Sequence, residues 1–317
     1  MKTSPNRPVG IGIDIGGTKT HLRISDPAGA GRDRVLPTDT WRLRQWDKDA
    51  EALLAIAADF AGAAPIAAIV IGAHGCDDQS ECDVFQAAFA RRATFPVQVV
   101  NDAELLPAAL GLAHEIGLVA GTGSIAVTRT RAGQMLVAGG WGWVIGDEGS
   151  ASGLVREAGR AVARHLESGG GMDEPLVRGL FAALEIRSSA RIGSAIARCG
   201  SAPALGRHAP MVFEAAEAGS DLARAVIRDG GGELAALVER LLSCGAEAKA
   251  VVAGGGVIVA QPLLWSAFVD AVATRFGGRI SAQLYTGAPV DGACRLVADL
   301  MSAPPIPILP SPRGTRA

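Results

Sequence analysis

The stretch VGIGIDIGGTKTHLRIS, residues 9–25, decides what kind of fold this chain can form. Residues 9–15 are a short, nearly continuous apolar run, which is typical of a buried strand. Gly16 and Gly17 interrupt the run, and strand character resumes over residues 20–24. A β-hairpin closed by a glycine turn is therefore expected here.

A second hairpin of the same kind is expected later in the chain. Residues 116–120 have strand character, Gly-Thr-Gly-Ser follows at 121–124, and residues 125–129 form another strand-like segment. A supersecondary unit that recurs at long spacing indicates a duplicated fold. Two glycine-rich hairpins could also arise by chance, but threonine in both turns favours two related lobes.

The remaining sequence alternates between strand-like and helical segments, which predicts an α/β fold. Apolar runs bounded by turn residues predict buried strands at 66–72, 97–100 and 250–253. Apolar residues at helical spacing predict helices at 49–62, 103–114 (with Asn101 or Asp102 as N-cap), 150–166, 262–276 and within 287–300. Residues 173–245 are expected to be mainly helical, with breaks at 200–203 and at the glycines 230–232.

Composition narrows the class of partner. The 317 residues carry a formal net charge of −2 without an evident basic face, so nucleic acid is not expected to bind. No apolar run approaches the roughly 20 residues that cross a bilayer. The opening MKTSPNRPVG has no signal-like apolar region, so we expect a cytoplasmic protein with no membrane partner.

The cysteines predict neither a disulfide framework nor a zinc site. They are odd in number, scattered and without a Cys-X-X-Cys pair, which fits free thiols. His74, Cys76, Asp77 and Cys82 offer an alternative metal cluster, although structural zinc usually uses tighter cysteine spacing. The five cysteines are Cys76, Cys82, Cys199, Cys244 and Cys294.

The turn of the first hairpin has the composition of an anion-binding loop. Gly16 and Gly17 let successive backbone N–H groups approach a phosphate, and Thr18 adds a hydroxyl donor before Lys19. Asp14, at the end of the preceding strand, is placed to hold Mg²⁺ directly or through water. An ordinary hairpin turn is the structural alternative. The chain has no Gly-Lys-Ser/Thr P-loop and no Gly-X-Gly-X-X-Gly after a strand.

Two further small-residue turns can complete a nucleotide site. The turn 121–124 presents two hydroxyls and could hold a polyphosphate from the opposite side. The stretch AGGGVI, residues 253–258, follows a strand and lacks Cβ bulk, as expected where a backbone packs flat on an adenine or ribose. Each turn alone is weak evidence for nucleotide binding. Only their combination in one chain indicates a nucleotide site.

Asp102 lies at a strand-to-helix junction in VVNDAELL, residues 99–106. A carboxylate there is accessible and rigidly held. Phosphoryl transfer needs such a group to orient an attacking hydroxyl and accept its proton. The alternative is a simple helix N-cap.

Together these motifs resemble those of a known family. Asp14 with GGTKT, Asp102 in NDA, then GTGS, GGWGWVIGDEGSASG (139–153) and AGGGV occur in the order seen in the N-acetylglucosamine kinases. These kinases belong to the BadF/BadG-type ATPase family, within the sugar kinase, Hsp70 and actin superfamily. The resemblance spans roughly residues 9–300, and the stretch with two tryptophans is its most specific part.

The resemblance implies a two-lobed, actin-like (ribonuclease H-like) ATPase fold with an interlobe cleft. Duplicated mixed sheets with flanking helices would form the lobes. Residues 1–112, joined by a helix returning at about 290–302, would be the N-terminal lobe, and 113–289 the C-terminal lobe. Residues 303–317 would be a proline-rich tail without regular structure. A homodimer is usual in the resembling family.

The resemblance also implies the activity and the site. ATP and an amino sugar, N-acetylglucosamine or glucosamine, would bind in the cleft, and Asp102 would be the general base for the 6-hydroxyl, with Mg²⁺ at Asp14. Trp143 is expected to pack rather than contact sugar, and Glu148 to cap the following helix. The implied ATP contacts are Gly16, Gly17, Thr18, Lys19, Gly121, Thr122, Gly123, Gly254, Gly255 and Gly256. The implied sugar contacts are Asp102, Gly140, Trp141, Gly142 and Asp147.

The sequence departs from the family pattern at two places. The family tends to place a sugar-contacting asparagine near positions 36–42, where this chain reads LPTDTWRLR (36–44). Thr38, Asp39 and Thr40 are the candidates to replace it, which leaves the identity of the amino sugar open. GAHGCDD, residues 72–78, also differs from the small-residue loop expected, and Asp77 or Asp78 could reach the cleft.

Three alternatives stay open. A ROK-type hexokinase shares the DIGGTK opening, but its Glu-X-Gly-His motif and cysteine-rich zinc loop are missing. An ATP-driven electron-transfer activator would need cysteines beside the second turn, and LVAGTGSIAV has none. A non-catalytic sugar sensor or repressor would need a DNA-binding helix pair, and we expect no room for one before the first strand.

Overall fold

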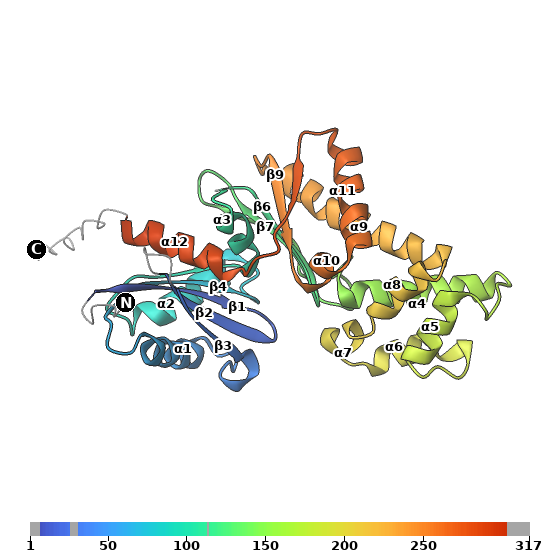
Figure 1. Cartoon of the computed structure of the whole chain (residues 1–317), viewed down its shortest axis with the longest axis horizontal. Coiled ribbons are helices and arrows are strands. Elements are labelled where there is room, and N and C mark those ends of the chain that lie inside the picture. The colour runs from blue at the N-terminus through green and yellow to red at the C-terminus, as the bar shows by residue number, and fades with distance from the viewer. Residues whose placement is uncertain (1–6, 26–30, 113, 303–317) are drawn as a thin grey trace, which may run out of the picture.

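The computed structural model describes residues 7–25, 31–112 and 114–302. The proline-rich segment 303–317 therefore lies outside the described residues. Two bodies stand side by side, each built on a five-stranded mixed sheet (Figure 1). The strands are β1 (Val9–Ile15), β2 (Lys19–Ser25), β3 (Arg32–Pro37), β4 (Ile66–Ala73), β5 (Val97–Val100), β6 (Ile116–Ala120), β7 (Ser124–Arg129), β8 (Met135–Gly139), β9 (Ala250–Gly254) and β10 (Ser281–Leu284).

The two sheets share one topology. The first runs β3-β2-β1-β4-β5 and the second β8-β7-β6-β9-β10. In each, the first three strands in chain order pair antiparallel and the last two add in parallel. The duplication expected from the two glycine hairpins is thus confirmed over whole sheets.

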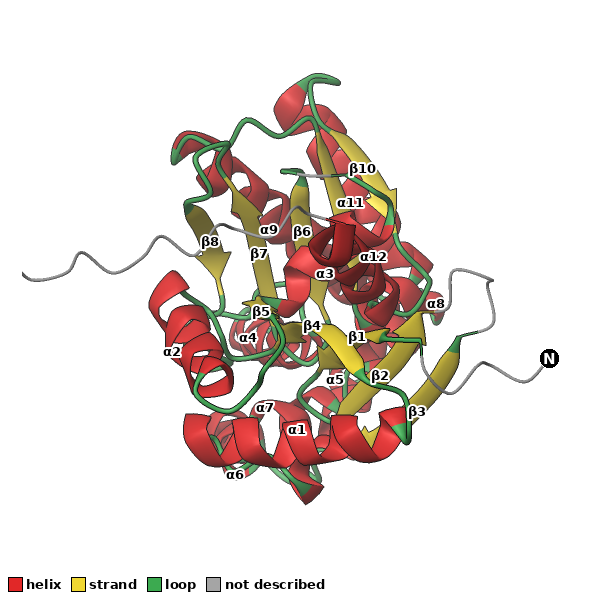
Figure 2. Cartoon of the chain, turned by 90° about the vertical axis from the view of Figure 1, so that its left-hand side faces the viewer, coloured by secondary structure: helices red, strands yellow, loops and turns green. Residues whose placement is uncertain are grey.

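Both faces of the first sheet are covered by helices. α1 and α2 share one core with its strands, in which Leu53 and Phe85 are buried. α12 lies on the other face against β1 and β4, beside the short α3, although it comes from the opposite end of the sequence (Figures 1 and 2). The helices are η1 (Thr38–Thr40), α1 (Trp46–Ala61), α2 (Gln79–Ala90), η2 (Asp102–Glu104), α3 (Leu105–Ala109) and α12 (Val290–Ser302).

The second sheet carries a large helical insertion between β8 and β9. α9 packs on β7 and β8, α11 packs on α9, and α3 contacts β6 and β9 from the side of the first body. The helices are α4 (Ala151–Glu167), α5 (Pro175–Ala183), η3 (Ser189–Arg191), α6 (Ile192–Arg198), α7 (Ala202–Gly206), α8 (Pro210–Glu217), α9 (Asp221–Ser243), α10 (Gly256–Ala260) and α11 (Pro262–Phe276). None of the described helices is long and apolar enough to cross a membrane.

The expected helix 103–114 is much shorter in the structure. One 3-10 turn, η2, leads into α3, which ends at Ala109. Gly111 then adopts a left-handed φ of 71°, and Leu112 N donates back to Pro107 O, which stops the helix. The sequence analysis does not predict the edge strands β3, β8 and β10, because short, partly exposed segments carry a weak apolar signal. Helix α2 is also not predicted, although it buries Phe85 and Phe89.

The expected break at 230–232 is wrong, since α9 runs through all three glycines. Gly230 and Gly231 are buried where α9 meets its neighbours. A Cβ at Gly231 would lie 2.7 Å from Ala267 Cβ on α11. The glycines therefore serve close helix packing, which a single sequence does not distinguish from a turn.

This packing gives a matched pair of stability predictions. Gly231→Ala should lower the free energy of unfolding by about 1–3 kcal/mol, because the new methyl group overpacks the contact with α11. Gly232→Ala, one position on, has no atom within 4 Å of its Cβ and should raise stability by up to about 1 kcal/mol. Chemical denaturation of both variants checks this. Equal effects would mean that α9 and α11 do not pack as described.

Candidate active site

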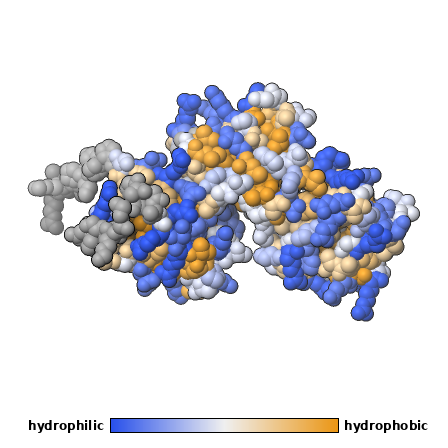
Figure 3. Space-filling model, in the orientation of Figure 1, coloured by the Kyte–Doolittle hydropathy of each residue, from blue (hydrophilic) through white to orange (hydrophobic). Residues whose placement is uncertain are grey.

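The candidate site gathers at the carboxyl ends of the parallel strands. Asp14 is near the end of β1, His74 follows β4, and Asp102 follows β5. Carboxyl ends of parallel strands share one edge of a sheet, which is where open α/β sheets bind ligands. The second body offers the matching turns after β6 and β9, and the surface is hollowed between the two bodies (Figure 3).

The first turn is held from behind by Thr38. Thr38 Oγ1 donates to Gly16 O at 2.9 Å, and Thr38 N donates to Thr18 O at 3.0 Å. The side chains of Thr18 and Lys19 stay exposed. The turn is thus rigid on one side and open on the other, as an anion-binding loop requires.

Thr38 is therefore occupied by the turn rather than available for a sugar. It is buried and also shares a 2.9 Å hydrogen bond with Thr20. Thr40 Oγ1 donates to Pro37 O at 2.6 Å, whereas Asp39 is exposed. Of the three side chains proposed to replace the asparagine, Asp39 is left with a free carboxylate in the described structure.

The second turn is fastened to the start of α4. Ala151 N donates to Gly121 O at 2.9 Å, and Ser152 Oγ donates to Thr122 O at 2.9 Å. The Thr122 side chain itself is exposed. This turn matches the first in having a fixed back and an open front.

Asp147 ties the tryptophan-containing loop to the second turn. Its Oδ1 accepts from Ser124 N at 3.2 Å, and a Cβ at Gly123 would lie 2.8 Å from that oxygen. Burial raises the pKa of Asp147, and the Ser124 hydrogen bond opposes the rise. Asp147 also adopts a left-handed φ of 58°, a conformation that aspartate tolerates better than most residues.

Glu148 does not cap α4, contrary to expectation. Ser150 is the N-cap, and its Oγ accepts from Gly153 N. Glu148 Oε2 is instead buried without a hydrogen-bond partner. The short side chain of a serine at the N-cap position accepts readily from the N–H group three residues later, as Ser150 does from Gly153. Glu148 lies two residues before the N-cap and is not in that position.

The two tryptophans are placed very differently. Trp141 is 73% exposed. Trp143 is half-buried and packs against the core of the second body, as the sequence predicts. Gly140 and Gly142 flank Trp141 with φ values of 75° and 80°, which bend the loop and turn the indole outward. Trp141 is thus available as an apolar wall for a ligand.

The glycine run 254–256, at the end of β9, includes positions where neighbouring chain atoms leave no room for a side chain. A Cβ at Gly255 would lie 2.6 Å from Ala120 O, and one at Gly254 would lie 2.8 Å from Leu106. Gly256 alone of the three has no atom within 4 Å of its would-be Cβ. Of the three glycines, Gly256 therefore has open space beside its backbone.

Asp102 is fixed where the two bodies meet. Asn101 caps η2 by accepting from Ala103 N, and Glu104 completes the capping box. A Cβ at Gly117 of β6 would lie 1.9 Å from Ala103 O, so this segment packs tightly on the second sheet. Asp102 Oδ1 is buried without a hydrogen-bond partner, which leaves it free to accept from a ligand.

His74 stands beside Asp102. Its Nδ1 lies 3.9 Å from Asp102 Oδ2, and a Cβ at Gly17 would lie 3.7 Å from its ring. It also lies in electrostatic range of Asp147 in the second body. The sequence indicates His74 only as a member of an alternative metal cluster with Cys76, Asp77 and Cys82. Among the described residues, no group of three or more His, Cys, Asp or Glu side chains could hold a metal ion.

The two aspartates of the following loop have separate places. Asp77 Oδ1 accepts from Asn101 Nδ2 at 3.3 Å, so it lies at the site. Asp78 is exposed and caps α2 by accepting from Glu81 N at 2.8 Å. Only Asp77 therefore meets the expectation that this loop reaches the cleft.

Asp14 fits a magnesium ligand. It is only 7% exposed, and burial raises its pKa to about 7, with nearby Asp102 adding to the rise and Lys19 opposing it. A buried carboxylate that is costly to ionise gains from a cation beside it. Mg²⁺ usually takes one or two carboxylates together with waters and substrate phosphates, so a single aspartate suffices.

Burial raises the pKa of Asp102; Asp77 adds to the rise and His74 opposes it. A general base must be ionised, so activity should fall as pH drops through this raised pKa. We expect kcat/KM at saturating Mg-ATP to fall on the acid side at a pH above 3.8, the ordinary pKa of aspartate. The residual rate of Asp102→Asn should lack the fall that Asp102 causes, and a fall that persists would belong to another group, such as Asp14, whose pKa is raised to about 7.

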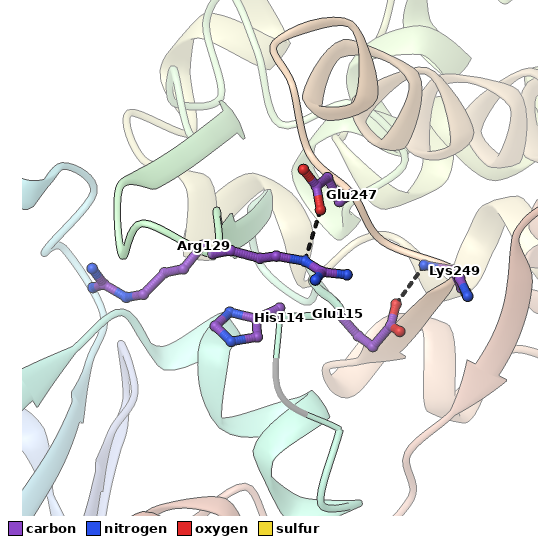
Figure 4. Close-up of a pocket in the computed structure, with 6 residues that line it drawn as sticks. His114, Glu115, Arg129, Glu247 and Lys249 are labelled. Carbon is purple, nitrogen blue, oxygen red and sulfur yellow. Dashed lines mark hydrogen bonds and ion pairs between the residues drawn. The ribbon is translucent and has the colours of Figure 1, made fainter.

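Two cavities lie away from the candidate site. One, of about 490 Å³, is lined by charged side chains at the opposite end of the second sheet (Figure 4). There Arg131 pairs with Glu247 at 2.8 Å, and Glu115 accepts from Lys249 N at 2.7 Å. The other, of about 550 Å³, lies between α4, α9 and residues 144–149. Glu148 and Gly149 line this second cavity and directly follow Asp147 of the candidate site in the chain.

Two sheets of one topology, each with a glycine-threonine turn in its first hairpin, give the two-lobed arrangement of the actin-like ATPase fold. The comparisons with known proteins agree. The chain belongs to the BadF/BadG/BcrA/BcrD ATPase family, whose sequence profile matches residues 11–294. The α/β fold expected from the sequence is thereby confirmed.

Individual relatives add detail. An N-acetylmuramic acid/N-acetylglucosamine kinase from Clostridium acetobutylicum is 30% identical over 151 residues, which cover 44% of this chain and 48% of that protein. The match thus spans about half of that relative. A candidate N-acetylglucosamine kinase from Chromobacterium violaceum is 25% identical, with a TM-score of 0.63 over 92% of this chain and 99% of that one. A ROK family glucokinase from Streptomyces griseus, at 21% identity and a TM-score of 0.58 over 92% and 98%, shares the fold.

Proposed function

We propose that the protein is an ATP- and Mg²⁺-dependent kinase that phosphorylates an amino sugar, N-acetylglucosamine or glucosamine, at its 6-hydroxyl. The observation that carries the proposal is Asp102, a largely buried carboxylate that follows β5, lies beside His74 and has an unpartnered buried oxygen. A base in that position can accept a hydroxyl proton while the turns hold a polyphosphate. The names of the relatives from Clostridium and Chromobacterium support an amino sugar as acceptor.

In the proposed reaction the sugar hydroxyl oxygen attacks the γ-phosphorus of ATP. Asp102 takes the hydroxyl proton, the bond from the γ-phosphorus to the bridging oxygen breaks, and ADP leaves. Backbone N–H groups of the turns at Gly17 and Gly123 stabilise charge on the phosphate oxygens. Mg²⁺ held at Asp14 would neutralise further charge on the phosphates.

The sugar would lie against the second body. Trp141 would cover an apolar face of the ring, and Asp147 would accept hydrogen bonds from its hydroxyls. The glycines at 140 and 142 would let the backbone approach. A homodimer in the cytoplasm is part of the same proposal, as the family resemblance implies, and light scattering in solution tests the dimer.

The electron-transfer activators are the main alternative within this fold. They hold an iron–sulfur cluster between subunits, which needs accessible cysteines near the nucleotide. Here Cys76, Cys82 and Cys294 are buried, and Cys199 and Cys244 lie in the helical part of the second body, so the kinase is favoured.

Purified protein with Mg-ATP and a panel of hexoses and hexosamines tests the proposal. We expect sugar-stimulated ADP release, strongest with amino sugars. ADP release that no sugar stimulates would contradict the kinase assignment. A preference for glucose over every amino sugar would instead favour a ROK-like hexokinase.

A further inference from the structure

The ring of His74 faces two different neighbours. Its Nδ1 lies 3.9 Å from Asp102 Oδ2, which is too long for a hydrogen bond but within range of an ion pair. The other edge of the ring faces the first glycine turn, because a Cβ at Gly17 would lie 3.7 Å from both Cδ2 and Nε2. The imidazole therefore stands between the candidate base and the turn that is proposed to hold phosphate.

The backbone fixes the place of this side chain. His74 N donates to Ile15 O at 2.8 Å, which continues the pairing of β1 with β4. Cys76 N donates to Ala73 O at 3.1 Å, and Gly75 has a left-handed φ of 77°, so the chain turns directly after His74. The side chain itself is 46% exposed. The ring is thus held at its root and accessible at its tip.

Within the described part of the chain, neither ring nitrogen of His74 has a hydrogen-bond partner. Other histidines do have one: His21 Nε2 shares a 2.6 Å hydrogen bond with Asp33, and His165 Nε2 shares one of 3.2 Å with Gly171 O. The family resemblance assigns no role to His74, which lies in the stretch 72–78 where this chain departs from the expected small-residue loop. Both nitrogens are therefore available to a ligand.

A positive charge on His74 acts on carboxylates of both bodies. Burial raises the pKa of Asp102 and of Asp77, and His74 is the leading influence that opposes each rise. Burial also raises the pKa of Asp147 in the second body, where His74 adds weakly to the opposing influences. His74 therefore lies within electrostatic reach of the proposed base and of a proposed sugar contact.

We propose that His74 is a second catalytic residue of the kinase, whose Nε2–H donates a hydrogen bond to the phosphoryl group during its transfer. A phosphate bound to the N–H of Gly17 would lie on the side of the ring that carries Nε2, while Nδ1 faces Asp102. The ring keeps its proton, and Asp102 still takes the proton of the acceptor hydroxyl. A fixed donor beside the transferring group stabilises the charge that spreads over its oxygens. The inference rests on the proposed kinase function and adds a residue to its reaction centre.

Three substitutions at this position test which nitrogen acts. The amide nitrogen of glutamine is as many bonds from Cβ as Nε2 of histidine, and that of asparagine is as many bonds away as Nδ1. His74→Gln therefore keeps a donor toward the turn, His74→Asn keeps one toward Asp102, and His74→Ala keeps neither. The control is His114→Asn, which changes an exposed histidine at the opposite end of the second sheet (Figure 4).

Steady-state kinetics with Mg-ATP and the best acceptor sugar give the first result. His74→Ala and His74→Asn should each lower kcat by about 100-fold, as for the loss of one transition-state donor, with both KM values within about 3-fold of wild type. His74→Gln should keep kcat within about 10-fold of wild type, and His114→Asn should match wild type. A smaller loss in His74→Asn than in His74→Gln would contradict the assignment of Nε2.

Inhibition by Mg-ADP with aluminium fluoride distinguishes a catalytic from a structural role, because the fluoride complex mimics the phosphoryl group in transfer. With the acceptor sugar present, wild type should bind this analogue about 100-fold more tightly than His74→Ala does. Both proteins should bind Mg-ADP alone equally well. A raised KM for the sugar with unchanged inhibition by the analogue would mean that His74 contacts the sugar, and the inference would be wrong.

The outcomes separate this inference from the kinase function. If wild type phosphorylates a sugar and His74→Ala does so at the same rate, the role of His74 alone is overturned. If no sugar stimulates ADP release by wild type, the kinase function is overturned and the inference with it. Should His74→Ala fail to fold, the comparison of His74→Gln with His74→Asn still decides which nitrogen acts.

Discussion

Asp102→Asn is expected to lower kcat for sugar phosphorylation by about 10²- to 10⁴-fold, the range typical of a lost general base. Asparagine keeps the size of the side chain but cannot accept the proton. The cap of η2 comes from Asn101 and not from Asp102, so the segment should stay in place. Steady-state kinetics with Mg-ATP and the best acceptor measure the effect.

The control for this variant is Asp83→Asn, which removes an exposed carboxylate from α2. It should retain the wild-type rate. Nucleotide binding by Asp102→Asn, followed by calorimetry, should stay close to that of wild type. A near-normal turnover in Asp102→Asn would show that another group accepts the proton, and His74 would then be the first candidate.

Trp141→Ala should raise KM for the sugar by about 10- to 100-fold, as expected from the loss of apolar cover and ring contact worth roughly 1.4–2.7 kcal/mol. The indole is 73% exposed, so its removal should cost little stability. KM for ATP should change much less, because the nucleotide turns lie elsewhere. Kinetics with each substrate varied in turn measure both constants.

Two neighbours of Trp141 serve as controls. Ile145 is 75% exposed on the same loop, and Ile145→Ala should affect neither KM. Trp143 packs on the core, and Trp143→Ala should lower the melting temperature. If Trp141→Ala raised both KM values equally, its role would be structural.

The sequence was most informative where backbone geometry demands particular residues. The hairpins around Gly16 and Gly121 need small residues in their turns. The short apolar runs that flank these turns are typical of buried strands. Both hairpins, and the duplication that they indicate, could therefore be predicted. Weakly patterned edges could not: β3 and β10 are half-exposed, so their residues resemble loops.

Glycine was the main source of error. The three glycines in α9 resemble a break in the sequence, but two of them allow helices to pack closely. The run Gly254–Gly256 stays a prediction for nucleotide binding, and at two of its positions, Gly254 and Gly255, neighbouring chain atoms also leave no room for a side chain. A glycine that allows a turn or a ligand contact and a glycine that allows close packing look identical in the sequence. Only the surrounding structure distinguishes the two roles.

The candidate site was predicted in part. Asp14 and Asp102 could be singled out from the sequence, because each lies at the end of a strand-like run and the family resemblance assigns both to the site. The place of His74 depends on how the loop after β4 folds over that edge. Nothing in the local pattern places this side chain, so its position is known only from the structure.

The position of the transferred phosphate tests the central claim most directly. After incubation of N-acetylglucosamine or glucosamine with Mg-ATP and the protein, phosphorus–proton correlation NMR of the product identifies the phosphorylated oxygen. We predict phosphate on oxygen 6, formed by wild type and nearly absent with Asp102→Asn. A product phosphorylated at another oxygen, or ADP and inorganic phosphate without a sugar phosphate, would contradict the account.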